Sequence, residues 1–135
     1  MYGGNPYSNA KRVVGLKLPV IQIRTVLPGE TVGYSNTWTA QKITKVATVS
    51  SGYADGIFRN MSNKATLYYN EIPNSIIGRI SMDLIGVDVS NCKEDPDYLW
   101  LLNGKQSIDD LAEEANSIGY EILTALGQRY NRIYI

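Results

Sequence analysis

Hydrophobic and polar residues alternate along most of the chain from Leu18 onward, as they do in a strand with one buried face. In the first such segment, Ile21, Ile23, Thr25 and Leu27 share one face. Further runs recur about every ten residues, with Gly, Asn or Pro between them. They cover residues 43–49, 65–69, 75–79, 84–89 and 98–102. This spacing predicts a small β-barrel or a sandwich.

One segment has helical spacing instead. Ser107 and Asp110 form a start that resembles a capping box, in which the serine side chain accepts a backbone N–H. The apolar stripe of this segment consists of Ile108, Leu111, Ala115 and Ile118. Gly119 is expected to end the helix, and a second short helical turn fits residues 121–126. The fold class is therefore mainly β, barrel- or sandwich-like, with one clear helix at about 107–118 and a last strand at 132–135.

Composition excludes several classes of function. The 135 residues, 15.0 kDa, are enough for one domain. Thirteen basic and thirteen acidic residues cancel, so no net charge attracts nucleic acid or an anionic membrane. The sequence has no histidine, which excludes Ser/His and Cys/His couples and zinc helices of the HExxH type. Cys92 is the only cysteine, so we expect neither an internal disulfide nor a metal site. A cytoplasmic location fits this cysteine content.

The ten tyrosines are the remaining candidates for chemistry. Tyr34 and Tyr53 each follow a glycine, in the segments VGYSNTWTA and SGYADGIFR. A phenol has a pKa near 10, so a tyrosine acting as a base needs a pKa lowered by about three units, for example by a neighbouring arginine. The alternative is a packed ring with a solvated hydroxyl, which is the commoner role of tyrosine. Composition alone favours the packed ring.

Five motifs follow one another in an order that resembles the C-terminal domain of alanine racemases. They read LPGETVGYSNTWTA, SGYADGIFRNMS, IIGRISMDLIGVDVS, IDDLAEEANSIGYEILTAL and a final RxxRIY. The resemblance covers essentially the whole chain. It implies a homodimer in which each subunit has an N-terminal barrel that holds pyridoxal phosphate on a lysine. A mostly β C-terminal domain would then cover the active site of the second subunit. Racemisation would use two bases, the barrel lysine and a tyrosine from the partner's C-terminal domain.

The same resemblance assigns roles to individual residues. Tyr34, in VGYSxTW, takes the position of the base that acts on the L-enantiomer. Tyr53, in GYADG, corresponds to a tyrosine that lines the substrate entryway and pocket. Arg59 and Arg79 match entryway arginines. Met82, in SMD, matches the residue whose backbone N–H meets the substrate carboxylate.

Two departures from the family pattern affect these expectations. The tail reads Arg129-Tyr130-Asn131-Arg132 where the family usually has RVPR, and Gln128 replaces a tyrosine near the cofactor phosphate. In addition, none of the seven lysines lies in a motif similar to KANAYGHG, which carries the cofactor lysine in the family. We therefore expect residues 1–16 to be the remnant of an inter-domain connection and residues 17–135 to be the C-terminal β-domain. Pyridoxal phosphate should be anchored elsewhere, and the isolated chain should be inactive.

The predicted partners are an N-terminal barrel, a second subunit and a small amino-acid substrate, with no nucleic acid or membrane. The bacterial function implied is the supply of D-alanine for peptidoglycan. Two alternatives stay open: a racemase of another amino acid such as serine, or a non-catalytic binding module. If the barrel is absent, an exposed apolar and aromatic patch should remain where it would sit. The residues expected near this patch are Tyr34, Trp38, Tyr53, Phe58 and Met82.

Overall fold

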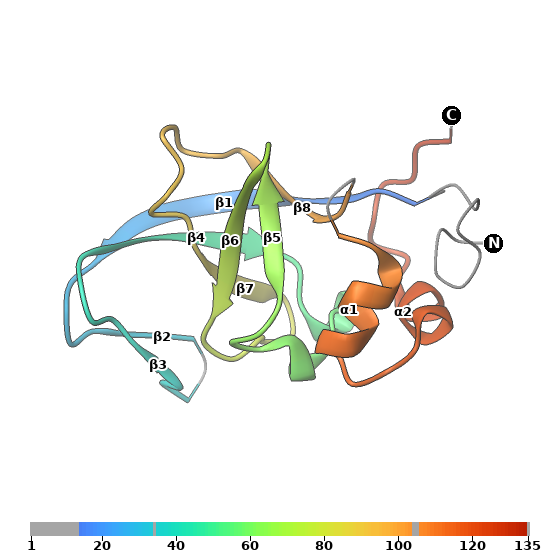
Figure 1. The fold of residues 1–135 in the computed structure, drawn as a ribbon, viewed down its shortest axis with the longest axis horizontal. Helices are drawn as coiled ribbons and strands as arrows, with labels where there is room; N and C mark the ends of the chain where they lie inside the picture. The colour runs from blue at the N-terminus through green and yellow to red at the C-terminus, as the bar shows by residue number, and fades with distance from the viewer. Residues whose placement is uncertain (1–13, 34, 104–105, 135) are drawn as a thin grey trace.

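Six antiparallel strands form a closed barrel in the computed structural model, which describes residues 14–33, 35–103 and 106–134 (Figure 1). Their order around the barrel is β1-β4-β7-β6-β5-β8. The bounds are β1 (Leu16–Val26), β4 (Thr44–Ser50), β5 (Thr66–Tyr69), β6 (Ile72–Ile77), β7 (Leu84–Asp88) and β8 (Tyr98–Leu102). The mainly β fold is thus confirmed, and the barrel is the correct one of the two predicted forms.

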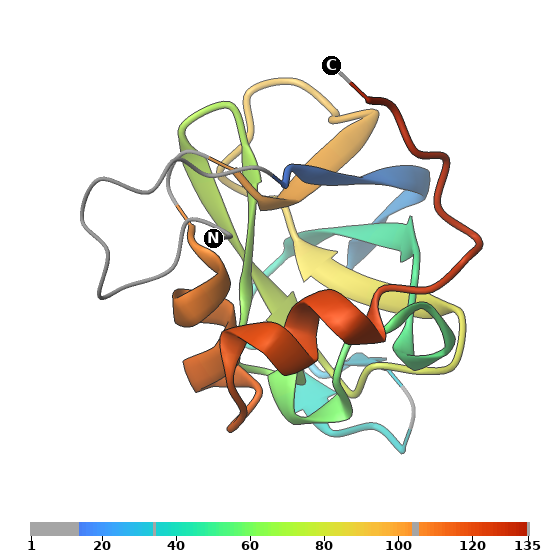
Figure 2. The same ribbon diagram turned by 90° about the vertical axis from the view of Figure 1, so that its right-hand side faces the viewer.

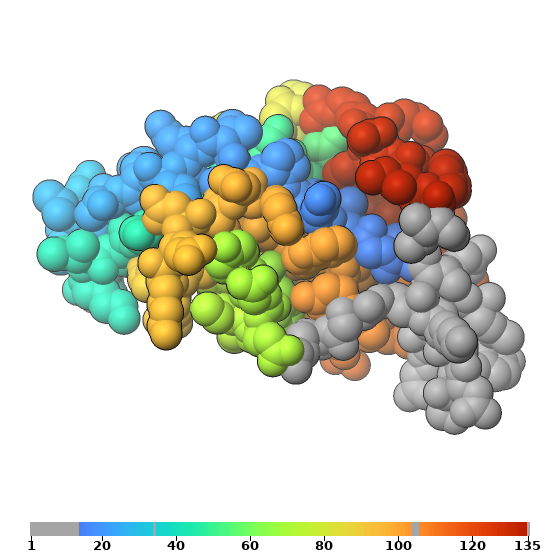
Figure 3. Space-filling model, turned by 90° about the horizontal axis from the view of Figure 1, so that it is seen from above, coloured from blue at the N-terminus to red at the C-terminus, as the bar shows by residue number. Residues whose placement is uncertain are grey.

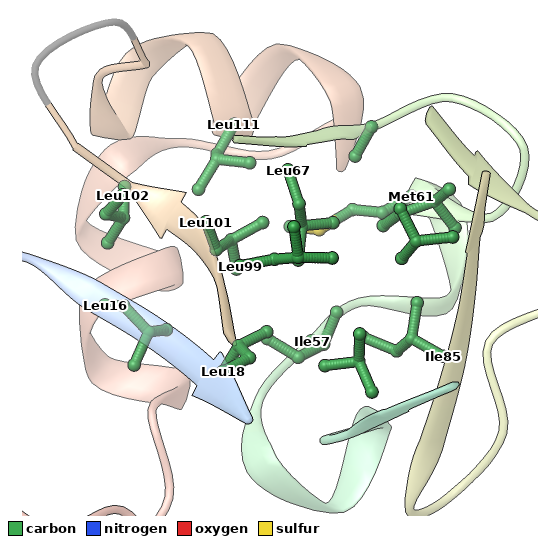
Figure 4. Close-up of a cluster of buried hydrophobic side chains, with 14 of the residues drawn as sticks. Leu16, Leu18, Ile57, Met61, Leu67, Ile85, Leu99, Leu101, Leu102 and Leu111 are labelled. Carbon is green, nitrogen blue, oxygen red and sulfur yellow. The ribbon is translucent and has the colours of Figure 1, made fainter. Parts of the chain in front are cut away.

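The interior of the barrel is filled by side chains that alternate along the strands. In β4, Ala47 and Val49 belong to the main core, while Val46 on the opposite face packs elsewhere. Leu18, Leu67, Leu99 and other aliphatic side chains from facing strands meet in the centre (Figure 4). This period of two is the geometric consequence of the strand pleat, and it explains why the sequence pattern located the strands.

The predicted face of β1 is correct only in part. Ile23 packs against the main core, as Leu16 and Leu18 do, but Ile21 is 60% exposed, and Leu27 lies beyond the strand and is 53% exposed. The pairing of β1 with β4 shifts between Val20 and Gln22, where the strand contains an irregularity. Because an extra residue moves the following side chains to the other face, a single alternating pattern cannot describe the whole strand.

A two-stranded hairpin covers part of the outer surface of the barrel. It consists of β2 (Thr31–Val32) and β3 (Trp38–Thr39). Strands of two residues are too short to produce a recognisable alternation of hydrophobic and polar positions in the sequence. Val32 packs with Val26, Val46 and Ile77 in a second, smaller cluster, against which Trp38 is half-buried. Both faces of β4 are therefore buried: the inner face in the barrel and the outer face under the hairpin.

Two helices lie at the end of the barrel that is away from this hairpin (Figures 1 and 2). The first, α1 (Ile108–Glu114), begins at Ser107 as predicted, because the Ser107 Oγ accepts the Asp110 N–H at 3.1 Å. It ends earlier than predicted, before Asn116, whose φ is 55°. Ile118 is consequently 64% exposed and not part of the buried stripe.

The residue expected to end the helix begins the second one. Gly119 is the first residue of α2 (Gly119–Ala125), so its predicted role as a stop is wrong. Within the described residues, no helix is long and apolar enough to cross a membrane.

The predicted last strand is absent from the described part of the tail, residues 131–134. Ile133 is 77% exposed and Tyr134 is 86% exposed. A strand needs a free sheet edge for pairing, and the pairing of β1 with β8 closes the barrel. The apolar residues of the tail therefore remain on the surface.

Candidate functional site

Two of the predicted motifs lie against each other, although they are almost thirty residues apart in sequence. The GYADG motif forms a short 3₁₀ helix, η1 (Tyr53–Asp55). The Tyr53 N–H donates to the Ser81 carbonyl oxygen at 3.0 Å, and the Ala54 N–H donates to the Met82 carbonyl oxygen at 3.1 Å. A Cβ atom on Gly52 would overlap with the same two carbonyl oxygens, so this close approach requires glycine.

Each of these two loops exposes one apolar side chain. Tyr53 is 46% exposed and Met82 is 51% exposed, which confirms the expected apolar surface at these positions. Trp38 and Phe58 were also expected near this surface, but they are half-buried against the hydrophobic clusters. Tyr34 lies outside the described residues.

A network of charged side chains joins the two loops to the C-terminal tail. Arg129 Nε donates to Asp55 Oδ1 at 2.6 Å, and Arg129 Nη2 donates to Asp55 Oδ2 at 2.7 Å. The same Nη2 donates to Asp83 Oδ1 at 2.8 Å. Arg129 thus forms a two-pronged contact with one carboxylate and a single contact with another, a geometry that its planar guanidinium allows.

Burial and charge make the two aspartates unequal. The Asp55 side chain is 4% exposed and the Asp83 side chain is 54% exposed. Hydrogen bonding by Arg129 is the main cause that lowers the pKa of Asp55, and burial opposes it. Hydrogen bonds to Asp55 and then Asp83 raise the pKa of Arg129. Both shifts favour the charged forms of Asp55 and Arg129.

The tail makes two further contacts with the GYADG loop. The Gly127 N–H donates to the Asp55 carbonyl oxygen at 3.2 Å, and the Tyr130 hydroxyl lies 2.9 Å from Ser51 Oγ. Figure 3 shows the tail beside the segments that carry these loops. Between these contacts Gln128 is exposed. These contacts fix the tail up to Tyr130, and the residues after it, 131–134, are exposed.

The predicted entryway arginines lie on segments that are also bonded to each other. Arg59 starts the 3₁₀ helix η2 (Arg59–Met61), and the turn that follows it binds the backbone next to Arg79. Ser62 Oγ accepts the Ile80 N–H at 2.8 Å, and Asn63 Oδ1 accepts the Gly78 N–H at 2.6 Å. These bonds place the Arg59 segment beside the Arg79 segment.

The loop that carries Tyr34 meets this region through backbone contact. A Cβ atom on Gly33 would lie 2.7 Å from the Arg79 nitrogen and 2.8 Å from the Gly78 Cα. Both Gly33 and Gly78 have positive φ, 87° and 78°. A small pocket of about 190 Å³, lined by Arg24, Arg79 and Gly33 among others, opens at this contact. Arg79 and the residue before Tyr34 therefore lie together.

The sequence predicted the two loops but not what joins them. Asp55 and Arg129 are 74 positions apart, and no periodicity or spacing relates an acidic residue to a basic one over that distance. The one feature of the sequence that could have pointed to Asp55 is that GYADG contains a single acidic residue, placed between an alanine and a glycine. Among the described residues, no group of three or more His, Cys, Asp or Glu side chains could hold a metal ion.

Comparison with known proteins identifies the family of this arrangement. The family model "Alanine racemase, C-terminal domain" matches residues 13–134. An alanine racemase of Cereibacter sphaeroides is 57% identical over 134 residues, which are 99% of this chain and 38% of that protein. The chain thus spans well under half the length of this relative.

Solved structures give the same result. The crystal structure of alanine racemase from Bartonella henselae with covalently bound pyridoxal phosphate aligns with a TM-score of 0.93 at 39% identity, over 99% of this chain and 39% of that one. The biosynthetic alanine racemase of Pseudomonas aeruginosa aligns with a TM-score of 0.89 at 32% identity, over 99% of this chain and 40% of that one. By sequence and by fold, the chain belongs to the alanine racemase C-terminal domain family.

Proposed function

We propose that residues 17–135 act as the C-terminal β-domain of a pyridoxal-phosphate-dependent alanine racemase, with residues 1–16 as its connection to an N-terminal barrel. The enzyme interconverts L- and D-alanine and supplies D-alanine for peptidoglycan. Its partners are the barrel and a second subunit, whose active site this domain completes. The observation that carries the proposal is the pairing of the GYADG and SMD loops, which presents Tyr53 and Met82 on one surface.

The SMD loop is suited to binding the substrate carboxylate. Ser81 closes the loop, because its N–H donates to the Leu84 carbonyl oxygen at 3.1 Å and its Oγ accepts the Leu84 N–H at 3.0 Å. Among the described residues, the Met82 N–H has no hydrogen-bond partner. An unpaired N–H of an exposed residue can donate a charge-assisted hydrogen bond to a carboxylate, and Met82 is 51% exposed. Met82 therefore binds the substrate through its backbone, and Tyr53 lines the pocket beside it.

Arg59 and Arg79 bring the amino acid to this surface. Arg59 is exposed and Arg79 is half-buried at the edge of the small pocket. Positive side chains near an opening attract an anionic group and raise its local concentration. These two arginines therefore guide the carboxylate of the substrate and select against molecules that lack one.

Tyr34 is the base that acts on L-alanine. Its role follows from the VGYSxTW motif, and the contact of Gly33 with Gly78 and Arg79 supports it by fixing the backbone just before the tyrosine. A tyrosine base needs a neighbouring cation to lower its pKa, and the Arg79 segment lies at this contact. Pyridoxal phosphate, when bound, supplies the electron sink that makes the α-proton acidic.

The contacts of three polar residues support a cofactor site outside the described part of the chain. Arg129, the cation of the tail, already contacts the carboxylates of Asp55 and Asp83, and Asp83 would repel a phosphate. Lys45 is paired with Asp95 at 2.7 Å. Gln128 is exposed and could donate a hydrogen bond, but an amide alone does not hold a phosphate. The cofactor is therefore anchored outside these residues, and the chain alone is inactive.

A chimera tests the proposal directly. This chain replaces the corresponding segment of the Cereibacter sphaeroides relative, and racemisation of alanine is measured with serine as the comparison substrate. We expect activity, with alanine preferred. Tyr34→Phe should lower racemisation roughly 100-fold or more, the range of a lost general base. Tyr68→Phe, a hydroxyl removed from the half-buried side chain of a barrel strand, is the matched control and should leave activity unchanged.

The direction of proton transfer needs a separate measurement. L- and D-alanine have equal free energies in water, so racemisation falls equally in both directions in any variant. Exchange of the α-proton with deuterated solvent is therefore followed for each enantiomer. Exchange lost mainly from L-alanine supports Tyr34 as its base. A chimera that folds but is inactive contradicts the proposal and favours a non-catalytic binding module. A preference for serine would show that the proposed substrate, alanine, is wrong.

A further inference from the structure

Arg129 is the one side chain, among the described residues, that bonds to both loops of the proposed site. Its two-pronged contact fixes it on Asp55, which lies in the GYADG loop and is almost fully buried. From there it reaches Asp83, the residue after Met82. Neither the family resemblance nor the site residues proposed above give Arg129 a role.

We infer that Arg129 is a positioning residue for substrate binding: through Asp55 and Asp83 it holds the Met82 N–H in the orientation that receives the substrate carboxylate. The inference rests on the proposed function of the Met82 loop and deepens it. Arg129 does not contact the substrate, because both of its described partners are carboxylates of this chain.

The geometry of the contacts supports this orienting role. The Ser81 carbonyl, which belongs to the same peptide group as the Met82 N–H, and the Met82 carbonyl of the next peptide group both accept hydrogen bonds from the GYADG loop. The exposed Asp83 would otherwise be free to turn, since its side chain is 54% exposed. Arg129 adds the third contact, on the side of Met82 away from Ser81. Three contacts around one N–H restrict its direction more than two.

Charge gives Arg129 a second effect on the same N–H. An unpaired Asp83 carboxylate would repel a substrate carboxylate that approaches the adjacent Met82 N–H. The guanidinium at 2.8 Å compensates that charge. Loss of Arg129 should therefore weaken substrate binding in two ways, by freeing the loop and by exposing a negative charge beside the binding group.

The test uses the active chimera with Arg129→Gln and Arg129→Lys. Lysine keeps the charge but cannot form the planar bridge to two carboxylates. We expect KM for both enantiomers to rise roughly 10- to 100-fold in the glutamine variant and less in the lysine variant, the range for a charged hydrogen bond. The value of kcat should fall by less than about 3-fold, because binding and not the chemical step is affected.

A rescue separates orientation and charge from a purely structural role. In the Arg129→Gln background, adding Asp83→Asn removes the exposed negative charge and should lower KM again. If Arg129 merely stabilised the tail through Asp55, this second change would leave KM as it was. Asp95→Asn is the matched control, because Asp95 is an exposed aspartate that pairs with Lys45 at 2.7 Å and belongs to neither loop. It should not change KM.

Hydrogen exchange gives a readout that does not depend on turnover. Deuterium uptake by peptides covering residues 51–56 and 80–84 should be faster in both Arg129 variants, while peptides from the barrel strands stay unchanged. Unchanged uptake at 80–84, or unchanged KM in active variants, overturns the inference and leaves the proposed function intact. An inactive parent chimera contradicts the proposed function, and the uptake measurement then still decides whether Arg129 holds the loop.

Discussion

The two halves of the proposed site are held by different forces. The loop before Tyr34 meets the Arg79 segment through Gly33 and Gly78, with backbone packed on backbone. The GYADG and SMD loops are joined by backbone hydrogen bonds and by the charged bridge of Arg129. The first contact depends only on the absence of side chains, whereas the second, which also requires glycine at Gly52, depends in addition on charge.

This difference predicts different sensitivities. A steric contact fails when one carbon atom is added, and it does not respond to pH or salt. A contact between charged groups survives small changes of shape but weakens when a carboxylate is protonated or, where it is exposed, when salt screens it. Substitutions in the two halves should therefore be separable by their dependence on solution conditions.

The largest effect is expected for Gly78→Ala. A Cβ atom at this position would lie 2.6 Å from the Val32 carbonyl oxygen, and the φ of 78° is unfavourable for alanine. Strain and overlap together should lower the free energy of unfolding by about 2–5 kcal/mol. Urea unfolding at low and high salt measures this loss, which should be the same in both.

Gly29→Ala is the matched control for this substitution. Gly29 has a φ of 91°, but a Cβ atom there has no neighbour within 4 Å. It should cost only the conformational strain of about 1–2 kcal/mol. If Gly78→Ala costs no more than Gly29→Ala, the backbone contact does not constrain the Tyr34 loop.

Asp55→Asn should have the next largest effect. It removes the buried carboxylate that accepts both prongs of Arg129, and it keeps the size of the side chain. We expect a loss of about 1–3 kcal/mol in the free energy of unfolding near neutral pH, since hydrogen bonds to a charged group are lost. Urea unfolding of the variant against the unsubstituted chain measures it, and an unchanged midpoint would show that the bridge does not stabilise the fold.

The contribution of Asp55 should depend on pH. Arg129 lowers the pKa of Asp55 in the folded protein relative to its ordinary value of about 3.9 in the unfolded chain. The stabilisation is therefore fully present above about pH 4 and is lost as the pH falls through the folded pKa. The difference between the unsubstituted chain and Asp55→Asn should shrink in acid, whereas the effect of Gly78→Ala should not. A difference that grows in acid would contradict the bridge.

Asp83→Asn should have the smallest effect on stability. Its carboxylate is half-exposed and makes a single contact with Arg129, so we expect a loss of less than about 1 kcal/mol. This loss should decrease as salt is added, because the exposed pair is screened. Unfolding midpoints measured at low and high ionic strength check it. A loss as large as that of Asp55→Asn would mean that the two carboxylates do not differ as their burial indicates.

The sequence by itself determined most of the secondary structure and the candidate site residues. Periods of two located the barrel strands, since the pleat makes side chains alternate, and the Ser107 capping pair located the start of α1. The family motifs pointed to Tyr53 and Met82, which do lie on neighbouring loops. The roles of these residues, and of Tyr34, stay predictions.

Only the tertiary structure decided the features that depend on distant neighbours. The irregularity in β1 left Ile21 on the surface, and closure of the barrel left the tail without an edge to pair with. The bridge from Asp55 through Arg129 to Asp83 joins residues from three parts of the chain. Local patterns report only what a residue does with its near neighbours in sequence, whereas burial, closure and ion pairing depend on which distant segments the fold brings together.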